Sequence, residues 1–297
     1  MNQIPVFYRP EQSCDQANSY SPSAGKPALV MQDWLKQPEI APYMSVEYFS
    51  PADAHMLYAA HDKGYVDRVM SGRQDNGFGN RSPAIAESLW YTVGSLVAAC
   101  KHVLGGAYDA NSKVAVSLTS GFHHAGYNFG GGFCTFNGLM VAAIRMHQLG
   151  LAKRILILDM DTHRGNGTED IIKHLGIDYI DHVTAGLSYR TAEEALRVSH
   201  MLHSLAVEHY DLVIYQAGAD MHIDDPLGGL LDTHEMALRD LGVFAGGIKR
   251  HTPIVWNLAG GYQTSLLGDI EPVLALHRQT MIYCCRAFHP GVSEADE

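Results

Sequence analysis

A short apolar run that ends in an acid-rich and glycine-rich turn constrains this chain more than any other stretch. Residues 155–158 read Ile-Leu-Ile-Leu, and the turn that follows carries Asp159, Asp161 and His163. An apolar run this short, bounded by such a turn, is typical of a buried strand. Residues two apart in an extended segment point to the same side, so the three side chains are predicted to face one cavity. The alternative is a strand-to-helix loop whose acids only bond backbone amides.

Apolar runs of similar length recur along the chain and alternate with helical patterns. Strands are predicted at residues 6–8, 114–118, 155–158, 179–184, 212–216 and 254–258, while residues 44–49 are ambiguous. Helices with clear start signals are predicted at residues 82–104, at residues 191–205 behind a capping box, and at residues 232–249. Alternation of this kind indicates an α/β fold, which we expect to form a single domain over residues 1–297.

Four of the predicted strands stop in small-residue turns that carry chemically capable side chains. These turns follow residues 118, 158, 216 and 258. In doubly wound α/β sheets, ligands bind outside the carboxyl ends of the strands, so the four turns are predicted to converge on one crevice.

Composition excludes several other classes of function. The net charge of −11 and the lack of a basic stripe argue against nucleic-acid binding. No apolar run reaches membrane-spanning length, and the first residues lack the pattern of a signal peptide. The chain has five cysteines without any CxxC spacing, which argues against structural zinc and a disulfide framework. We therefore expect a cytoplasmic protein in a reducing compartment.

The turns supply a candidate metal site. Asp161, His163 and Asp220 offer two carboxylates and one imidazole, which suit a catalytic divalent metal with an open position for water. Zinc fits this nitrogen and oxygen set, with ferrous iron as the alternative. Zinc lowers the pKa of its bound water to about 7 and so produces a nucleophile at neutral pH.

Proton transfer and charge stabilisation also have candidates. His123 and His124 are adjacent in the sequence and suit two positions beside the water, as base and as acid. Asp159 is placed to orient one imidazole and Asn166 the other. Tyr262, in a glycine-rich turn, can donate its hydroxyl to a developing oxyanion.

Each of these residues also has an ordinary structural interpretation. A His pair is often a satisfied surface or core pair, and Asp220 alone is most often a turn or cap residue. Tyr262 and Phe133 alone are more often packing residues. The combination across four strand ends favours a site. Seven further histidines in predicted helices are interpreted as solvated or half-buried: His102, His147, His174, His200, His203, His209 and His277.

At this point the chain resembles the arginase–deacetylase superfamily, on its histone deacetylase-like side, which includes acetylpolyamine amidohydrolases. The matching motifs are Ser-Gly-Phe-His-His-Ala-Gly at 120–126, Gly-Phe-Cys-Thr-Phe-Asn at 132–137, Leu-Asp-Met-Asp-Thr-His-Arg-Gly-Asn-Gly-Thr at 158–168, Gln-Ala-Gly-Ala-Asp at 216–220 and Gly-Gly-Tyr at 260–262. The resemblance implies a three-layer, doubly wound fold around an eight-stranded, mainly parallel sheet with helices on both faces.

The resemblance also implies roles for single residues. It assigns zinc to Asp161, His163 and Asp220, and a general base and acid pair to His123 and His124. Asp159 and Asn166 would support that pair, and Tyr262 would polarise the scissile carbonyl. Gly132 and Phe133 would line an acyl-lysine tunnel, and Gly260 and Gly261 would contact substrate. Members of the family also often hold K⁺ near Asp159, Asp161 and His163.

The sequence departs from the family pattern at three places. Arg164 stands where many members have a second His after the metal ligand. Residues 179–189 offer no evident second aromatic wall for the tunnel. The rim loop at residues 75–81 lacks an acidic substrate clamp, unless Asp75 serves.

We therefore expect a zinc-dependent deacetylase that hydrolyses the amide of an N-acetylated amine, either acetyl-lysine or a small acetylated polyamine-like compound. Its partner would be this small-molecule or peptide substrate, without nucleic acid or membrane, and a homo-oligomer stays open. One alternative is a binuclear manganese ureohydrolase, with His124, Asp224 and Asp225 as further ligands. Another is a non-catalytic module that binds acylated ligands.

Overall fold

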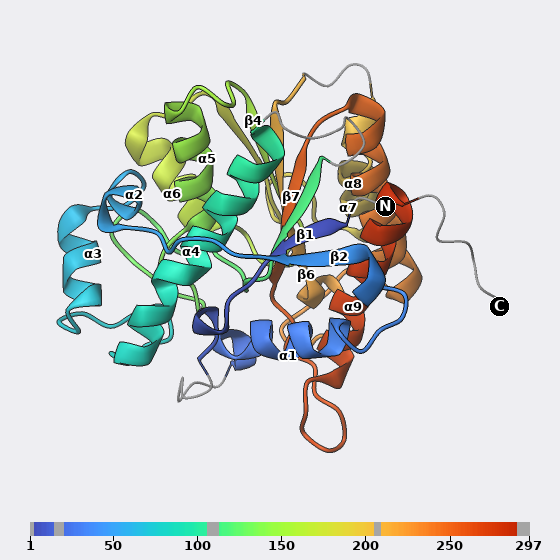
Figure 1. The fold of residues 1–297 in the computed structure, drawn as a ribbon, viewed down its shortest axis with the longest axis horizontal. Coiled ribbons are helices and arrows are strands. Elements are labelled where there is room, and N and C mark those ends of the chain that lie inside the picture. Colours follow the sequence, from blue (N-terminus) through green and yellow to red (C-terminus); the bar gives the residue numbers. More distant parts are fainter. Residues whose placement is uncertain (1–2, 15–20, 106–112, 205–208, 290–297) are drawn as a thin grey trace.

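Short extended runs of the chain pair into one sheet in which every strand is parallel to its neighbours (Figure 1). The computed structural model describes residues 3–14, 21–105, 113–204 and 209–289. Within these residues the strands are β1 (Ile4–Phe7), β2 (Met44–Glu47), β3 (Val114–Ser117), β4 (Ile155–Asp159), β5 (Ile180–Val183), β6 (Leu212–Gly218) and β7 (Ile254–Ala259). Their order across the sheet is β2-β1-β3-β7-β6-β4-β5.

The α/β fold is confirmed, but the expected number of strands is wrong. The described residues form seven strands, not eight. Six of them are the apolar runs predicted as strands, and the ambiguous run at residues 44–49 contains the seventh, β2. The number eight came from the resemblance alone, and no apolar pattern in the chain called for an eighth strand.

Helices cover both faces of the sheet (Figure 1). They are α1 (Lys26–Trp34), α2 (Ala54–Tyr58), α3 (Lys63–Met70), α4 (Pro83–Leu104), α5 (Gly138–Gln148), α6 (Asn166–Leu175), α7 (Ala192–Ser199), α8 (Thr233–Arg250) and α9 (Glu271–Phe288). Helices α1, α7, α8 and α9 share one apolar cluster with the sheet, while α2 to α6 share the other. No described helix combines the length and apolar character that a membrane span requires.

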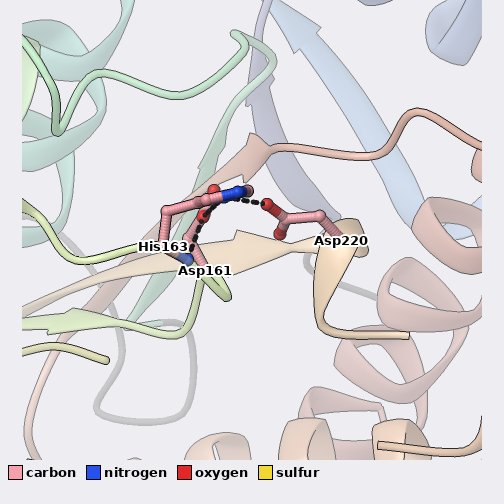
Figure 2. Close-up of side chains that lie close together, drawn as sticks. All are labelled: Asp161, His163 and Asp220. Carbon is pink, nitrogen blue, oxygen red and sulfur yellow. Dashed lines mark hydrogen bonds and ion pairs between the residues drawn. The ribbon is translucent and has the colours of Figure 1, made fainter. Parts of the chain in front are cut away.

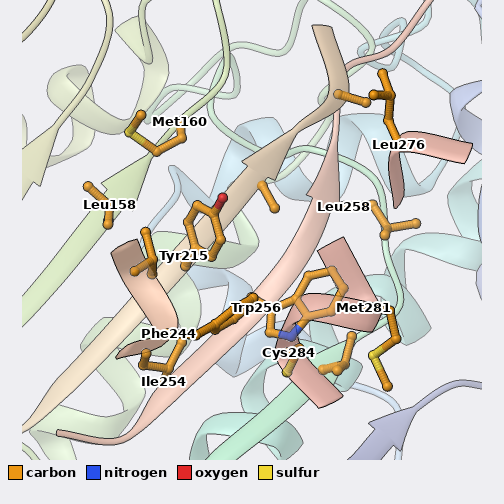
Figure 3. Packing of buried hydrophobic residues seen from close by; sticks show 14 of the residues in the cluster. Leu158, Met160, Tyr215, Phe244, Ile254, Trp256, Leu258, Leu276, Met281 and Cys284 are labelled. Carbon is orange, nitrogen blue, oxygen red and sulfur yellow. The ribbon is translucent and has the colours of Figure 1, made fainter. Parts of the chain in front are cut away.

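The strands divide their side chains between two cores. Leu156 and Leu158 of β4 belong to one cluster, and Ile155 and Ile157 to the other. This follows from the period of two in a strand, and strands buried on both faces read as continuous apolar runs. Figure 3 shows the first cluster, where Trp256 of β7 packs among side chains of α8 and α9.

Several helix predictions are confirmed and others need correction. The helices at residues 82–104 and 232–249 are α4 and α8, capped by Ser82 and Asp232 as expected. Helix α7 ends at Ser199, and Leu205 of the predicted helix lies outside the described residues. Its capping box is incomplete, because the Glu194 side chain accepts from Arg190 N.

One further helix escaped prediction, and the predicted environment of one histidine is wrong. Helix α3 has no counterpart among the predicted helices, because its eight residues, Lys63–Met70, are too few to show a clear period. His277 on α9 is only 1% exposed and so is neither solvated nor half-buried, because α9 packs this face onto the core.

The parallel direction of the strands brings their carboxyl ends to one edge. β4 and β6 are neighbours, with Asp159 opposite Gln216 in their register. The turns after these two strands therefore lie side by side, and Figure 2 shows that they carry Asp161, His163 and Asp220.

Candidate active site

Three side chains with metal-donor atoms converge at the ends of β4 and β6. His163 Nδ1 lies 3.0 Å from Asp161 Oδ1 and 3.0 Å from Asp220 Oδ2 (Figure 2). One donor atom from each residue lies within 4.8 Å of the others, and both carboxylates are buried. Among the residues that the structure describes, this is the one cluster of three or more such side chains. It is the set that the sequence predicted.

Backbone contacts hold the two turns together. His163 N donates to Asp161 Oδ1 over 2.9 Å, which curls the turn around its own acid. A Cβ on Gly218 would lie 2.6 Å from Asp161 Cα, so the end of β6 can approach the turn only because residue 218 is glycine. The sequence predicted Asp159 in the turn. In the structure it is instead the last residue of β4.

Burial and proximity make the two carboxylates inequivalent. Burial, followed by repulsion from Asp161, raises the pKa of Asp220 to about 8. Hydrogen bonds to both carboxylates raise the pKa of His163 to about 10. His163 and Asp220 thus hold protons near neutral pH, and a cation that binds to these side chains would release them.

The two adjacent imidazoles lie beside this cluster but have different partners. His123 Nδ1 lies 2.7 Å from Asp159 Oδ2, whereas His124 Nδ1 lies 2.6 Å from Asn166 Oδ1. Their ring centroids are 4.1 Å apart. In both rings Nδ1 is bonded away from the cavity, which leaves Nε2 for chemistry.

Their electrostatic environments differ accordingly. Burial opposes protonation of His123, but Asp159 and Asp161 outweigh it and raise its pKa to about 9. Burial and the neighbouring His123 lower the pKa of His124. The neighbouring carboxylates therefore favour the protonated form of His123, whereas burial and His123 favour the neutral form of His124.

Two residues that support Asp159 had no predicted role. Gln216 donates from Nε2 to Asp159 Oδ1 over 2.8 Å and accepts from Phe122 N over 3.0 Å. Thr184 donates to Asp159 Oδ2 over 3.4 Å and accepts from Gly165 N over 2.8 Å. Gln216 lies within β6 and Thr184 directly follows β5, and the position of Gln216 four residues before Asp220 was the available signal.

The cavity above the cluster has aromatic walls. It is lined by Gly132, Phe133, Gly260 and Tyr262 together with the imidazoles, and the Phe133 and Tyr262 rings lie 5.9 Å apart. Phe133 has a positive φ of 63°, which is rare for a residue with a side chain and is held here by a hydrogen bond from its N–H to Gly77 O. Burial, followed by the nearby carboxylates, raises the pKa of Tyr262, so its phenol stays protonated.

Gly260 and Gly261 differ in position. A Cβ on Gly260 would lie 2.2 Å from Asp220 Cγ, so residue 260 must be small for the three candidate ligand side chains to come together. Gly261 packs against Ala219 and Val273 and is not among the residues that line the cavity. The Gly260 carbonyl accepts from Lys26 Nζ, a buried amine whose pKa burial lowers to about 8. Lys26 begins α1, and no sequence pattern linked it to the site.

The structure shows the partners of the residues at which the sequence departs from the family pattern. Arg164 pairs with Glu169 on α6 through contacts of 2.9 and 2.6 Å, and it does not contact the candidate metal ligands. Tyr189, the aromatic residue near the end of the segment at 179–189, is buried and donates to the carbonyls of Asp159 and Asp161. The ring beside Phe133 is instead Phe78, at 5.8 Å. Asp75 is paired with Arg81.

Comparison with known proteins places this chain in a family. Residues 24–178, just over half of the chain, match the histone deacetylase domain. The chain belongs to the histone deacetylase family. Members of this family are metal-dependent hydrolases that remove acyl groups from amines, so the ligand cluster and the family agree on a metal enzyme.

Individual relatives support this assignment. The chain is 32% identical to histone deacetylase 2 of Arabidopsis thaliana over 195 residues, 57% of this chain and 49% of that protein. It is 48% identical to the acetylpolyamine amidohydrolase of Mycoplana ramosa over 68 residues, 23% of this chain and 20% of that protein. An uncharacterised protein of Picosynechococcus sp. is 26% identical over 271 residues, 84% of this chain and 88% of that protein.

Solved structures share the fold. An acetylpolyamine aminohydrolase from Burkholderia pseudomallei superposes with a TM-score of 0.70 at 18% identity, over 95% of this chain and 98% of that one. The HD domain of HDA15 gives a TM-score of 0.72 at 18% identity, over 97% and 88%. The chain spans about half or less of the named deacetylases that it matches in sequence, although it spans most of the Picosynechococcus protein.

Proposed function

We propose that this chain is a zinc-dependent deacetylase that hydrolyses the amide of an N-acetylated amine, within one catalytic domain at residues 1–297. The observation that carries the proposal is the meeting of three metal-donor atoms, two imidazoles and a phenol at one cavity. These groups come from four strand ends and have the chemistry that amide hydrolysis requires.

The proposed ligands fit a divalent cation. Asp161 and Asp220 are 3% and 0% exposed, and the structure brings their carboxylates onto one imidazole. Two like charges buried together are costly unless a cation neutralises them. When bound, zinc or ferrous iron supplies a Lewis acid that polarises a carbonyl and lowers the pKa of water. For K⁺ the support is weaker, because the carbonyls of Asp159 and Asp161 already accept from Tyr189.

His124 is the proposed general base and acid. Its partner is the neutral Asn166 amide, which favours the protonated form much less than a carboxylate would, and burial lowers the pKa of His124. It accepts a proton from the attacking water on Nε2 and returns it to the leaving nitrogen. His123 is bonded to the buried carboxylate of Asp159, which favours its protonated form, so it would stabilise the negative charge that develops on the carbonyl oxygen.

Tyr262 is the proposed oxyanion donor. Its phenol stays protonated through neutral pH, and its ring faces the cavity beside Phe133. The substrate acyl group would enter the cavity that these two rings line, with Gly132 in the same wall.

The alternatives have less support from the described residues. A second manganese site would need Asp224 and Asp225, but Asp224 is exposed beside His222. Asp225 accepts from Tyr262 N over 2.8 Å and from Leu227 N over 3.0 Å, so its carboxylate is already bonded. A non-catalytic module would not require two differently supported imidazoles beside the ligand cluster.

The decisive experiment measures acetate release by metal-loaded protein. Protein stripped with a chelator and reloaded with zinc or ferrous iron should release acetate from acetyl-lysine peptides or from N-acetylated diamines. Asp220→Asn, which removes one ligand charge at constant size, should bind metal more weakly and lose activity. Protein with one metal ion per chain that cleaves no substrate in either class would overturn the proposal.

A further inference from the structure

A second depression lies at the turn that leads into the wall of the cavity. It is lined by the last turn of α3, the loop after it and a glycine-rich turn, through Arg68, Arg73, Gln74, Asp75, Asn76, Gly77, Gly79, Arg81, Phe129, Gly130 and Gly131. The glycine-rich turn runs directly into Gly132 and Phe133 of the active-site wall. Gly77 O accepts from Phe133 N over 3.0 Å, which fixes the loop to the tunnel. We call the arginine-bearing side of this depression, Arg68, Arg73 and Arg81, the arginine shelf.

The arginine shelf is strongly positive in a chain that is strongly negative. Three arginines and one aspartate line the depression, which leaves two net positive charges, while the chain carries −11. All three arginines are exposed.

Two of the three guanidinium groups bond neutral partners. Arg68 Nε donates to Gln74 Oε1 and Arg73 Nε to Ser71 Oγ, each over 2.8 Å. In each case only Nε is used in these bonds, so the terminal nitrogens can form the two-point contact that guanidinium makes with a carboxylate. Asp67 on α3 is bonded by Lys63 and by the Tyr58 hydroxyl, and it also lies close enough to Arg73 for their charges to attract.

The third arginine neutralises the charge of Asp75, the acid that the sequence suggested as a substrate clamp. Arg81 Nε lies 2.6 Å from Asp75 Oδ1, with both side chains more than half exposed. Asp75 is therefore paired, and it is the one acid that lines the depression. A cationic substrate such as an acetylated polyamine would meet repulsion at this rim.

We propose that the arginine shelf binds a carboxylate of the substrate while the acylated amine occupies the cavity. The inference rests on the proposed deacetylase function and names its substrate class: acyl-amines that carry a negative charge outside the tunnel. Acyl-lysine itself qualifies through its own carboxylate, and so does an acyl-lysine peptide with acidic neighbours. Acetylated diamines do not.

The test compares matched substrates that differ in one charge. Free Nε-acetyl-lysine is compared with its amide, which removes the main-chain carboxylate. End-blocked acetyl-lysine peptides with flanking Glu are compared with peptides with flanking Gln. We expect the carboxylate to raise kcat/KM about tenfold at low salt in at least one pair, with the advantage shrinking as salt rises. The pair that responds identifies the source of the carboxylate.

Variants locate the effect. The double substitution Arg68→Gln and Arg73→Gln should remove the higher kcat/KM of the carboxylate-bearing substrates. The kcat for the uncharged member of each pair should stay within about twofold. Arg197→Gln removes the same type of charge from α7, on the other face of the sheet, and should leave the advantage intact. Matched thermal denaturation curves will show that the exposed substitutions preserve the fold.

Binding separates this inference from the proposed function. If no turnover is found, calorimetric titration of the same compounds onto metal-loaded protein reports their Kd. If no substrate is cleaved but the carboxylate-bearing compounds bind with lower Kd, the deacetylase proposal is wrong and carboxylate binding by the arginine shelf is supported. Equal Kd and equal kcat/KM within both pairs, or an advantage that survives in the double variant, would overturn the shelf.

Discussion

Single atoms distinguish the two imidazoles of the site. His123 meets a carboxylate and His124 meets an amide, although Asp159 and Asn166 have the same shape. A carboxylate favours the charged form of an imidazole, whereas an amide oxygen has a much smaller effect. The different roles proposed for the two imidazoles therefore depend on one atom, the second carboxylate oxygen of Asp159 that is an amide nitrogen in Asn166.

This difference can be removed at constant size. Asn166→Asp should raise the pKa of His124, because the new carboxylate stabilises its imidazolium form. A general base works only when neutral, so the acidic limb of the kcat/KM profile should move to higher pH by about one unit. The measurement is a pH–rate profile with metal loading checked at each pH. An unmoved limb would show that His124 is not the base.

The phenol of Tyr262 is the second test at this scale. Tyr262→Phe keeps the ring beside Phe133 but removes the only donor that the side chain offers. Loss of one oxyanion donor typically costs about 10²–10³ in kcat, and KM should change far less. Steady-state kinetics on the acetylated substrate should show this loss at unchanged metal content. A variant as active as the parent would remove Tyr262 from the mechanism.

At the scale of elements, the start of α6 holds the backbone of the His pair. Gly167 N and Thr168 N donate to His123 O over 2.9 and 3.1 Å. A Cβ on Gly167 would lie 2.4 Å from the Ala125 carbonyl carbon and 2.5 Å from that of His124. The helix can therefore approach the loop this closely only with glycine at position 167.

Gly167→Ala should separate positioning from metal binding. The added methyl pushes the imidazoles away from their partners, so kcat should fall by about 10²-fold, the cost expected of a displacement near 1 Å. Stability should fall by about 1–3 kcal/mol from overpacking. Gly176→Asn at the other end of α6 is the control, because Gly176 has a φ of 62° and open space around it. Equal kcat in the two variants would contradict this role for α6.

Local pattern was sufficient for the elements that carry the site, but not for the contacts between them. The apolar run at residues 155–158 predicted β4, and the spacing of Asp161 and His163 predicted ligands that face one way. Gln216 and Lys26 reach the site only through tertiary contacts, to Asp159 and Gly260 respectively. Their environments depend on which strands are neighbours, and no periodicity in the sequence records that order. The arginine shelf is a similar case, because it joins α3 to a turn some sixty residues away in the chain.

At the scale of the whole molecule, a buried histidine joins three separate segments. His61 lies between α2 and α3, and its Nδ1 lies 2.8 Å from Gly126 O. Its Nε2 accepts from Asn137 N over 2.9 Å, at the start of α5. Because one nitrogen donates and the other accepts, only the neutral imidazole satisfies both contacts. Burial lowers the pKa of His61 to about 4 accordingly.

This arrangement links the stability of the fold to pH. The folded pKa lies below the unfolded value of 6.5, so the contribution of His61 is complete above pH 6.5 and is lost as pH falls towards 4. The linkage relation gives a loss of about 2 kcal/mol between pH 7 and pH 5. His61→Gln can donate to Gly126 and accept from Asn137 without titrating, so its free energy of unfolding should decline less by that amount. Urea unfolding of both proteins at the two pH values, with chelator present, measures the difference. Because His277 and the other buried histidines are common to both proteins, an identical decline would mean that His61 is not the group that titrates.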